Sequence, residues 1–221
     1  MTLAFRPRLD ILPPAQKDLW PLLRSATDLG FVLYGGTAIA LRLGHRASVD
    51  FDLFTDKPLD KDRLHKGLPF LEKATVLQDA PDTLTVLVPG GSGSVKISFF
   101  GSIAFGRVGE PERTEDSIML VASPQDLLAL KLKVILQRVE GKDYVDIAAL
   151  LRSGLPLDEG LGATRALYGQ AFQPAECLKA LVYFEGGDLS DLPMDVKKTL
   201  IEAARQAGNP PKVEVVSRTL V

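Results

Sequence analysis

The sequence predicts an α+β fold, with a mixed α/β first half over residues 1–122 and a helical second half over 123–221 that packs on it. Short β-prone segments alternate with helical ones up to Pro124, and helical spacing dominates after that residue. Hydrophobic residues make up 46% of the 221 residues and charged residues 24%, as in an ordinary globular protein. A chain of this length can therefore bury a sizeable core in one or two domains.

In the first half, glycine and proline mark where the predicted elements start and stop. A helix over 14–29 opens on a proline pair, which a first helical turn tolerates, and Pro21 could kink it. Gly35-Gly36 forms a sharp turn between a strand over 31–34 and a helix over 37–43. The other elements predicted here are strands over 48–54, 75–77, 83–88 and 95–100, a helix over 59–71, and a hairpin loop over 90–94.

The second half reads as a series of helices with the 3.6-residue period. The predicted helices span 126–140, 142–153, and about 158–168, 174–184 and 194–207. The tail carries one short β-prone run, 213–216, which could add to a sheet edge.

Charge and cysteine content exclude several classes of protein. A net charge of -2 gives no global argument for nucleic-acid binding, which usually leaves a basic footprint. Cys177 is the single cysteine, so a disulfide framework within the chain is excluded and a reducing cytosol is expected. The N-terminus lacks the apolar region of a signal peptide, and no apolar run reaches the roughly 18 residues that span a bilayer. We therefore expect a cytoplasmic protein without a membrane partner.

The turn Gly35-Gly36-Thr37 is a candidate binding site for phosphate groups. The N-terminus of a helix offers unpaired N–H groups and a partial positive charge. Two glycines allow a phosphate to approach the backbone closely, and Thr37 adds a hydroxyl group. The alternative is an ordinary strand-to-helix turn that needs glycine only for its backbone angles.

Asp50 and Asp52 are candidate metal ligands. Side chains two positions apart on a strand point the same way, so both carboxylates are expected on one face. Their mutual repulsion would be relieved by a divalent cation such as Mg²⁺ or Mn²⁺, and Mg²⁺ commonly uses one or two carboxylates together with substrate phosphates. The alternative is a pair of solvated acids on an edge strand.

Lys131 and Arg138 are candidate phosphate-binding cations. Seven residues apart on one helix, they would lie within about 20° of each other on its apolar side. Lys133 would fall with Asp126 on the polar side and be solvated. On the next helix Asp143 could orient Lys131 or approach the metal, and so could Asp146 on the same face. The alternative to phosphate binding is therefore an internal ion pair between Lys131 and one of these two acids.

Together, three segments resemble the AbiEii/AbiGii-type toxin family of minimal nucleotidyltransferases, within the DNA polymerase β-like superfamily. These segments are 34–46, 48–54 and 131–147, and the resemblance covers about 30–155. It implies a nucleotidyltransferase-type mixed β-sheet with flanking helices. It also implies that Gly35, Gly36 and Thr37 hold the nucleoside triphosphate, that Asp50 and Asp52 hold Mg²⁺ or Mn²⁺, and that Lys131, Arg138 and Asp143 contribute to nucleotide binding and activity.

The resemblance implies a toxin-like enzyme that transfers NMP from an NTP to an acceptor hydroxyl. The acceptors implied are an RNA or transfer RNA end, or a protein, and an antitoxin is the implied protein partner. One departure keeps an alternative open, because larger nucleotidyltransferases carry a third acid on a later strand, where this chain has Ser98. The alternative is a catalytically degenerate module that binds nucleotide or serves in a toxin–antitoxin interaction.

Overall fold

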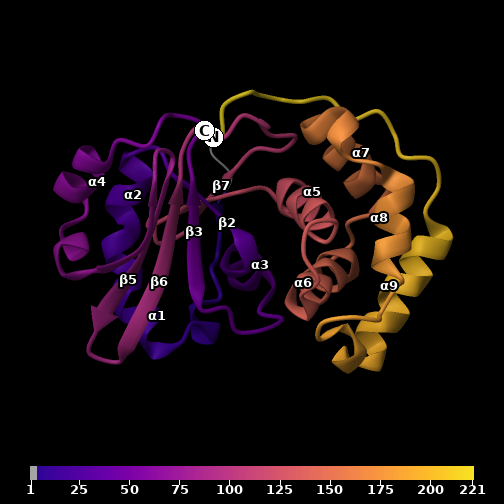
Figure 1. The fold of residues 1–221 in the computed structure, drawn as a ribbon, viewed down its shortest axis with the longest axis horizontal. Helices are drawn as coiled ribbons and strands as arrows, with labels where there is room; N and C mark the ends of the chain where they lie inside the picture. The colour runs from indigo at the N-terminus through magenta and orange to yellow at the C-terminus, as the bar shows by residue number, and fades with distance from the viewer. Residues whose placement is uncertain (1–3) are drawn as a thin grey trace. The chain divides into compact units, whose positions relative to one another are not determined.

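The computed structural model describes residues 4–221, which form two compact units (Figure 1). The first unit comprises the chain up to Gly106, together with Glu110–Ala122 and Ser217–Val221. The second unit comprises Arg107–Gly109 and Ser123–Val216. The chain thus enters the second unit briefly at Arg107–Gly109, enters it again after Ala122, and returns to the first unit for its last five residues.

The first unit is built on a mixed sheet, and the α+β prediction is confirmed. Within the described residues the sheet has eight strands in the order β1-β7-β8-β2-β3-β6-β5-β4. The central strand β3 runs antiparallel to β2 and parallel to β6. The strands are β1 (Ala4–Phe5), β2 (Val32–Tyr34), β3 (Asp50–Phe54), β4 (Thr75–Ala80), β5 (Thr83–Gly90), β6 (Gly93–Phe100), β7 (Glu112–Thr114) and β8 (Leu120–Val121).

The strands β1, β7 and β8 were not predicted, because two or three residues are too few to show alternation. The hairpin between β5 and β6 is confirmed, but it is tighter than predicted. Strand pairing continues to Gly90 and Gly93, which leaves only residues 91–92 in the turn.

Proline residues interrupt two of the predicted helices in this unit. The helix predicted over 14–29 is divided by a 3-10 turn that contains Pro21, whose missing N–H removes a helical hydrogen bond. The helix predicted over 59–71 ends early, and a 3-10 turn beginning at Pro69 follows, because the residue before a proline avoids the helical conformation. The helices are α1 (Pro14–Leu19), α2 (Arg24–Asp28), α3 (Gly35–Leu43) and α4 (Lys61–Gly67), with 3-10 turns at Trp20–Leu23 and Pro69–Lys73.

One face of this sheet is apolar and the other carries the polar residues of β3. Phe51 and Leu53 are fully buried, and the ring of Phe51 lies 6.1 Å from that of Trp20. Helices α2 and α4 lie on one side of the sheet and α3 on the opposite side (Figure 1). Since side chains alternate along a strand, burial of Phe51 and Leu53 directs Asp50 and Asp52 to the other face.

The second unit is helical, as predicted, but its first helix is shorter. That helix ends at Val134 rather than near 140, because i+3 hydrogen bonds such as that from the Gln137 N–H to the Val134 carbonyl tighten the chain into a turn. The run 213–216 forms no strand in the described structure, and the Val216 N–H bonds the Arg107 carbonyl. The helices are α5 (Pro124–Val134), α6 (Gly141–Arg152), α7 (Leu157–Tyr168), α8 (Pro174–Leu181) and α9 (Met194–Gln206), with 3-10 turns at Gly169–Ala171 and Leu189–Asp191.

None of the helices in residues 4–221 has both the length and the apolar character that crossing a membrane requires.

Candidate functional site

The turn between β2 and α3 is packed closely against neighbouring charged side chains. Gly35 has a φ of +74°, and a Cβ atom there would collide with the carboxylate of Asp52. A Cβ atom on Gly36 would meet the guanidinium group of Arg46 and would lie 3.0 Å from Ser48 Oγ. Glycine is therefore required at Gly35 by its backbone angle and by the close approach of Asp52, whereas a side chain at Gly36 would have to displace the flexible end of Arg46.

The first turn of α3 retains the features expected of a phosphate-binding helix N-terminus. The helix begins at Gly35 with Tyr34 as N-cap, and the Tyr34 side chain does not cap the first turn in the described structure. The helix therefore starts two residues before the predicted start at Thr37, which is the third helical residue. Its side chain is buried and its hydroxyl donates a hydrogen bond to the Asp50 carbonyl. Thr37 thus joins the start of α3 to β3, and phosphate contacts in this turn would come from backbone N–H groups.

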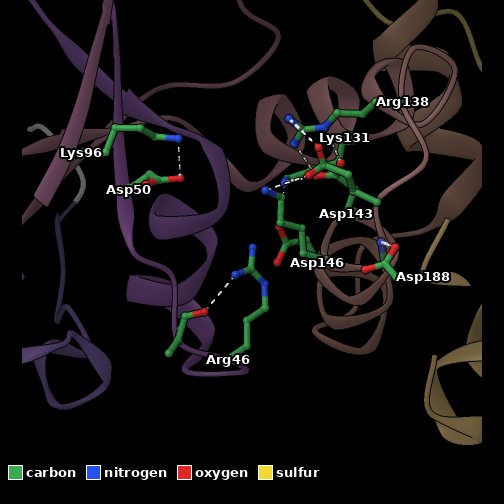
Figure 2. Close-up of polar contacts among 12 residues, drawn as sticks. Arg46, Asp50, Lys96, Lys131, Arg138, Asp143, Asp146 and Asp188 are labelled. Carbon is green, nitrogen blue, oxygen red and sulfur yellow. Dashed lines mark hydrogen bonds and ion pairs between the residues drawn. The ribbon is translucent and has the colours of Figure 1, made fainter. Parts of the chain in front are cut away.

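Asp50 and Asp52 lie on one face of β3, and two residues of β6 lie across from them. In the parallel register Asp50 is opposite Lys96 and Asp52 is opposite Ser98. The Lys96 ammonium Nζ is 3.0 Å from Asp50 Oδ2. Figure 2 draws this ion pair as a dashed line. Both side chains are partly exposed, Lys96 by 42% and Asp50 by 30%. We call these four residues the carboxylate face.

The place of a third acid is taken by a hydroxyl group. Ser98 is buried, and its hydroxyl lies 3.3 Å from that of Thr85 on β5. Across residues 4–221, no group of three or more His, Cys, Asp or Glu side chains is arranged to hold a metal ion. The carboxylate face does fit a Mg²⁺ site in which two carboxylates supply the protein ligands and substrate phosphates and water supply the rest. The ion pair with Lys96 shows that the Asp50 carboxylate already binds a cation on this face.

In the second unit, Lys131 is held inside a cluster of ion pairs. Its ammonium group lies 2.6 Å from Asp143 Oδ1 and 2.7 Å from Asp146 Oδ2. Only 6% of the Lys131 side chain is exposed, and both aspartate side chains are fully buried. Of the two alternatives, the internal ion pair is the one that the structure contains, and it involves both acids. We call Lys131, Arg138, Asp143 and Asp146 the buried ion cluster.

Arg138 approaches this cluster from the turn after α5. Its Nε donates to Asp143 Oδ2 at 2.8 Å and its Nη2 to Asp143 Oδ1 at 3.1 Å (Figure 2). The predicted position of Arg138 on the apolar stripe of a longer helix is therefore wrong, since α5 ends four residues earlier. Burial alone would raise the pKa of the Asp143 carboxyl, but the Arg138 hydrogen bond and the Lys131 charge hold it below its usual range.

Asp126 also lies elsewhere than predicted. It is buried, and it accepts hydrogen bonds from the backbone N–H groups of Val108 and Gly109 and from the Ser123 hydroxyl. Burial raises the pKa of this carboxyl, and those hydrogen bonds oppose the effect. Lys133, placed with it on the polar side, is partly exposed and donates to the carbonyl of Ala171.

The predicted site residues therefore form two groups, one in each unit. Gly35, Gly36, Thr37, Asp50 and Asp52 belong to the first unit, whereas Lys131, Arg138 and Asp143 belong to the second. Sequence reasoning missed Lys96 as a member of the carboxylate face. The signal that could have found it is strand alternation, because Lys96 and Ser98 are two apart in the strand already predicted to follow the hairpin.

Comparison with known proteins identifies the family. A family model described as "Nucleotidyl transferase AbiEii toxin, Type IV TA system" matches residues 18–214. The chain belongs to the AbiEii family. An uncharacterized protein from Aquifex aeolicus (strain VF5) is 34% identical over 177 residues, which cover 77% of this chain and 83% of the relative. The resemblance is confirmed, and the AbiEii match extends well beyond 30–155 into the helices of the last third.

Membership in this family assigns the chain to nucleotidyl transferase toxins of toxin–antitoxin systems. In this AbiEii chain, the segments that carried the resemblance contain the turn, Asp50 and Asp52 of the carboxylate face, and the buried ion cluster.

Proposed function

We propose that this chain transfers NMP from an NTP to an acceptor hydroxyl, with Mg²⁺ or Mn²⁺ held by Asp50 and Asp52. The observation that carries the proposal is the position of two carboxylates on one face of β3, directly beside the N-terminal turn of α3. The Thr37 hydrogen bond to the Asp50 carbonyl fixes the two elements to each other. A phosphate-binding helix end and a metal-binding pair would thus be adjacent within one unit.

The proposed roles in the first unit follow from this geometry. Backbone N–H groups at Gly35, Gly36 and Thr37 bind the triphosphate, because they lie at the positive end of α3. The acceptor hydroxyl attacks the α-phosphorus, its proton passes to solvent, and the bond to the leaving pyrophosphate breaks. Asp50 and Asp52 would hold the metal ion with their carboxylate oxygens. An ion held there would supply charge neutralisation and activation of the attacking hydroxyl.

We propose that the buried ion cluster positions a phosphate-binding arginine. The Arg138 side chain is 46% exposed, and beside its two bonds to Asp143 its Nη1 lies 3.7 Å from Glu140 Oε1. Lys131 is enclosed by the two acids and holds Asp143 in place. Arg138 would therefore be the phosphate-binding residue of the second unit, while Lys131 and Asp143 act as positioning residues.

The proposed acceptor is the hydroxyl group of an RNA or transfer RNA end, or of a protein. The proposed partner is an antitoxin, in keeping with the toxin–antitoxin description of the family. A second candidate function is a nucleotide-binding module without turnover, and the observation that favours it is the Ser98 hydroxyl at the place of a third acid.

Incubation with total RNA, Mg²⁺ and each α-³²P-labelled NTP in turn tests the proposal. The informative variant is Asp52→Asn, which removes the charge but keeps the shape that packs against Gly35. We expect labelled RNA with the wild type and at least about a hundredfold less with the variant, because the metal loses a charged ligand. Unchanged labelling in the variant would overturn the metal role. Tight nucleotide binding without labelling of RNA or protein, for every NTP, would favour the non-catalytic module.

A further inference from the structure

Lys96 is a charged residue of the carboxylate face to which the proposed chemistry assigns no role. It stands across from Asp50 in the parallel register of β3 and β6, with its ammonium 3.0 Å from the Asp50 carboxylate. The neighbouring position on the same face is Ser98, across from Asp52. One side of β6 therefore presents a cation and a neutral hydroxyl group toward two acids.

The ion pair between Lys96 and Asp50 is weak enough for another cation to replace the lysine ammonium. Both side chains are partly exposed, and water and salt weaken an ion pair in such a place. A divalent cation carries twice the charge of an ammonium group and can share the oxygens of Asp50 and Asp52. It would therefore displace Lys96 from Asp50, but only against the competition and repulsion of that positive charge.

We propose that Lys96 is a built-in counter-ion that keeps free divalent metal off Asp50 until a nucleoside triphosphate arrives with it. This inference rests on the proposed nucleotidyl transfer. In the empty site, Lys96 reduces the formal charge of the face from −2 to −1 and so weakens its attraction for free metal. When a metal–nucleotide complex binds, the phosphates supply further oxygen ligands for the metal. They also supply negative charge for the displaced ammonium.

Once displaced from Asp50, the Lys96 ammonium can move to the phosphates proposed to bind at the first turn of α3, within the same unit. Asp50 is joined through its carbonyl to Thr37 in the first turn of α3, where the phosphates are proposed to bind. Lys96 lies on the strand next to Asp50, and its four-carbon side chain lets the ammonium move without any change in the backbone. The lysine is thus expected to favour metal and nucleotide binding together and to oppose metal binding alone.

Titration with Mn²⁺, followed by the loss of its free-ion electron paramagnetic resonance signal, tests this directly and needs no turnover. We compare wild type, Lys96→Met and Lys96→Arg, with Lys61→Met as matched control. Lys61 also makes a partly exposed ion pair in the first unit, with Asp79, but from α4 to the edge strand β4. Thermal unfolding checks that each variant is folded.

We expect Lys96→Met to bind free Mn²⁺ about threefold to tenfold more tightly than the wild type. In the presence of a non-hydrolysable NTP analogue, the same variant should bind the analogue more weakly by a similar factor. Lys96→Arg and Lys61→Met should each stay within about twofold of the wild type in both titrations. Opposite shifts in the two titrations are not expected of a lysine with a purely structural role.

Two results would overturn the inference, and they are distinguishable. If the wild type binds Mn²⁺ and Asp50→Asn abolishes this, but Lys96→Met binds free Mn²⁺ no more tightly, the inference about Lys96 fails while the proposed metal site stands. If neither wild type nor Lys96→Met binds Mn²⁺ with or without the NTP analogue, the metal-dependent function fails and this inference fails with it.

Discussion

Each unit of this protein contains an ion pair between lysine and aspartate, but the two pairs differ in their exposure to solvent. On the carboxylate face, Lys96 and Asp50 share one contact and are 42% and 30% exposed. In the buried ion cluster, Lys131 contacts both Asp143 and Asp146, and all three side chains are almost completely buried. Burial makes an ion pair hard to break, whereas exposure makes it weak and exchangeable. The first arrangement is therefore suited to binding a ligand and the second to holding a side chain in place.

The largest effect is expected from breaking the buried ion cluster. Lys131→Met leaves two buried carboxylates with one fewer cation, so the free energy of unfolding should fall by about 3–5 kcal/mol. Urea denaturation followed by circular dichroism measures this change. The double variant Lys131→Met/Asp146→Asn should be more stable than the single variant, because it removes one of the unpaired charges. A loss below about 1 kcal/mol in Lys131→Met would show that the cluster is not a structural unit.

A smaller effect is expected from placing a third acid on the carboxylate face. Ser98→Asp adds a carboxylate at a buried position across from Asp52, so without metal the protein should lose about 1–3 kcal/mol of stability. Saturating Mn²⁺ should restore part of that loss, because binding to the folded state stabilises it. Denaturation with and without Mn²⁺ measures both changes. The same loss in both conditions would show that position 98 does not face the metal.

The two regions also differ in how well the sequence predicted them. The turn at Gly35 and the strand through Asp52 were predicted because the signals are local, namely paired glycines and alternating acids. Lys96 was missed because strand alternation places it only on the same face as Ser98. Its pairing with Asp50 depends on the register of two parallel strands, which a single sequence does not reveal.

Long-range contacts explain the errors in the second unit as well. Asp126 was assigned to a polar side because helical periodicity gives the position of a residue around its own helix but not its contacts with other segments. Its partners are the backbone of Val108 and Gly109, which lie in the segment that enters this unit ahead of α5. Lys131 was assigned to the inward side correctly, since that position follows from spacing along α5, whereas Arg138 lay beyond the true end of the helix.

Acid should weaken the buried ion cluster selectively. The pKa of Asp143 is lower in the folded protein than its unfolded value near about 4, so its stabilising contribution is complete above that value. The contribution is lost as the pH falls through the lower, folded pKa. Urea denaturation between about pH 6 and pH 3 should show stability falling at the acid end. Asp143→Asn should give a flatter curve there, and an equally steep curve would assign the loss to other carboxyl groups.

The smallest change in stability is expected from Lys96→Met, although this variant is expected to alter metal binding. An exposed ion pair contributes about 0–1 kcal/mol, so the free energy of unfolding should shift by less than about 1 kcal/mol. The same urea denaturation used for Lys131→Met measures it, with Lys61→Met as control. A loss near that of Lys131→Met would mean that Lys96 is a structural residue, and the contrast between an exchangeable and a fixed lysine would not hold. A small loss would leave Lys96 free to be exchanged for metal at little cost to the fold.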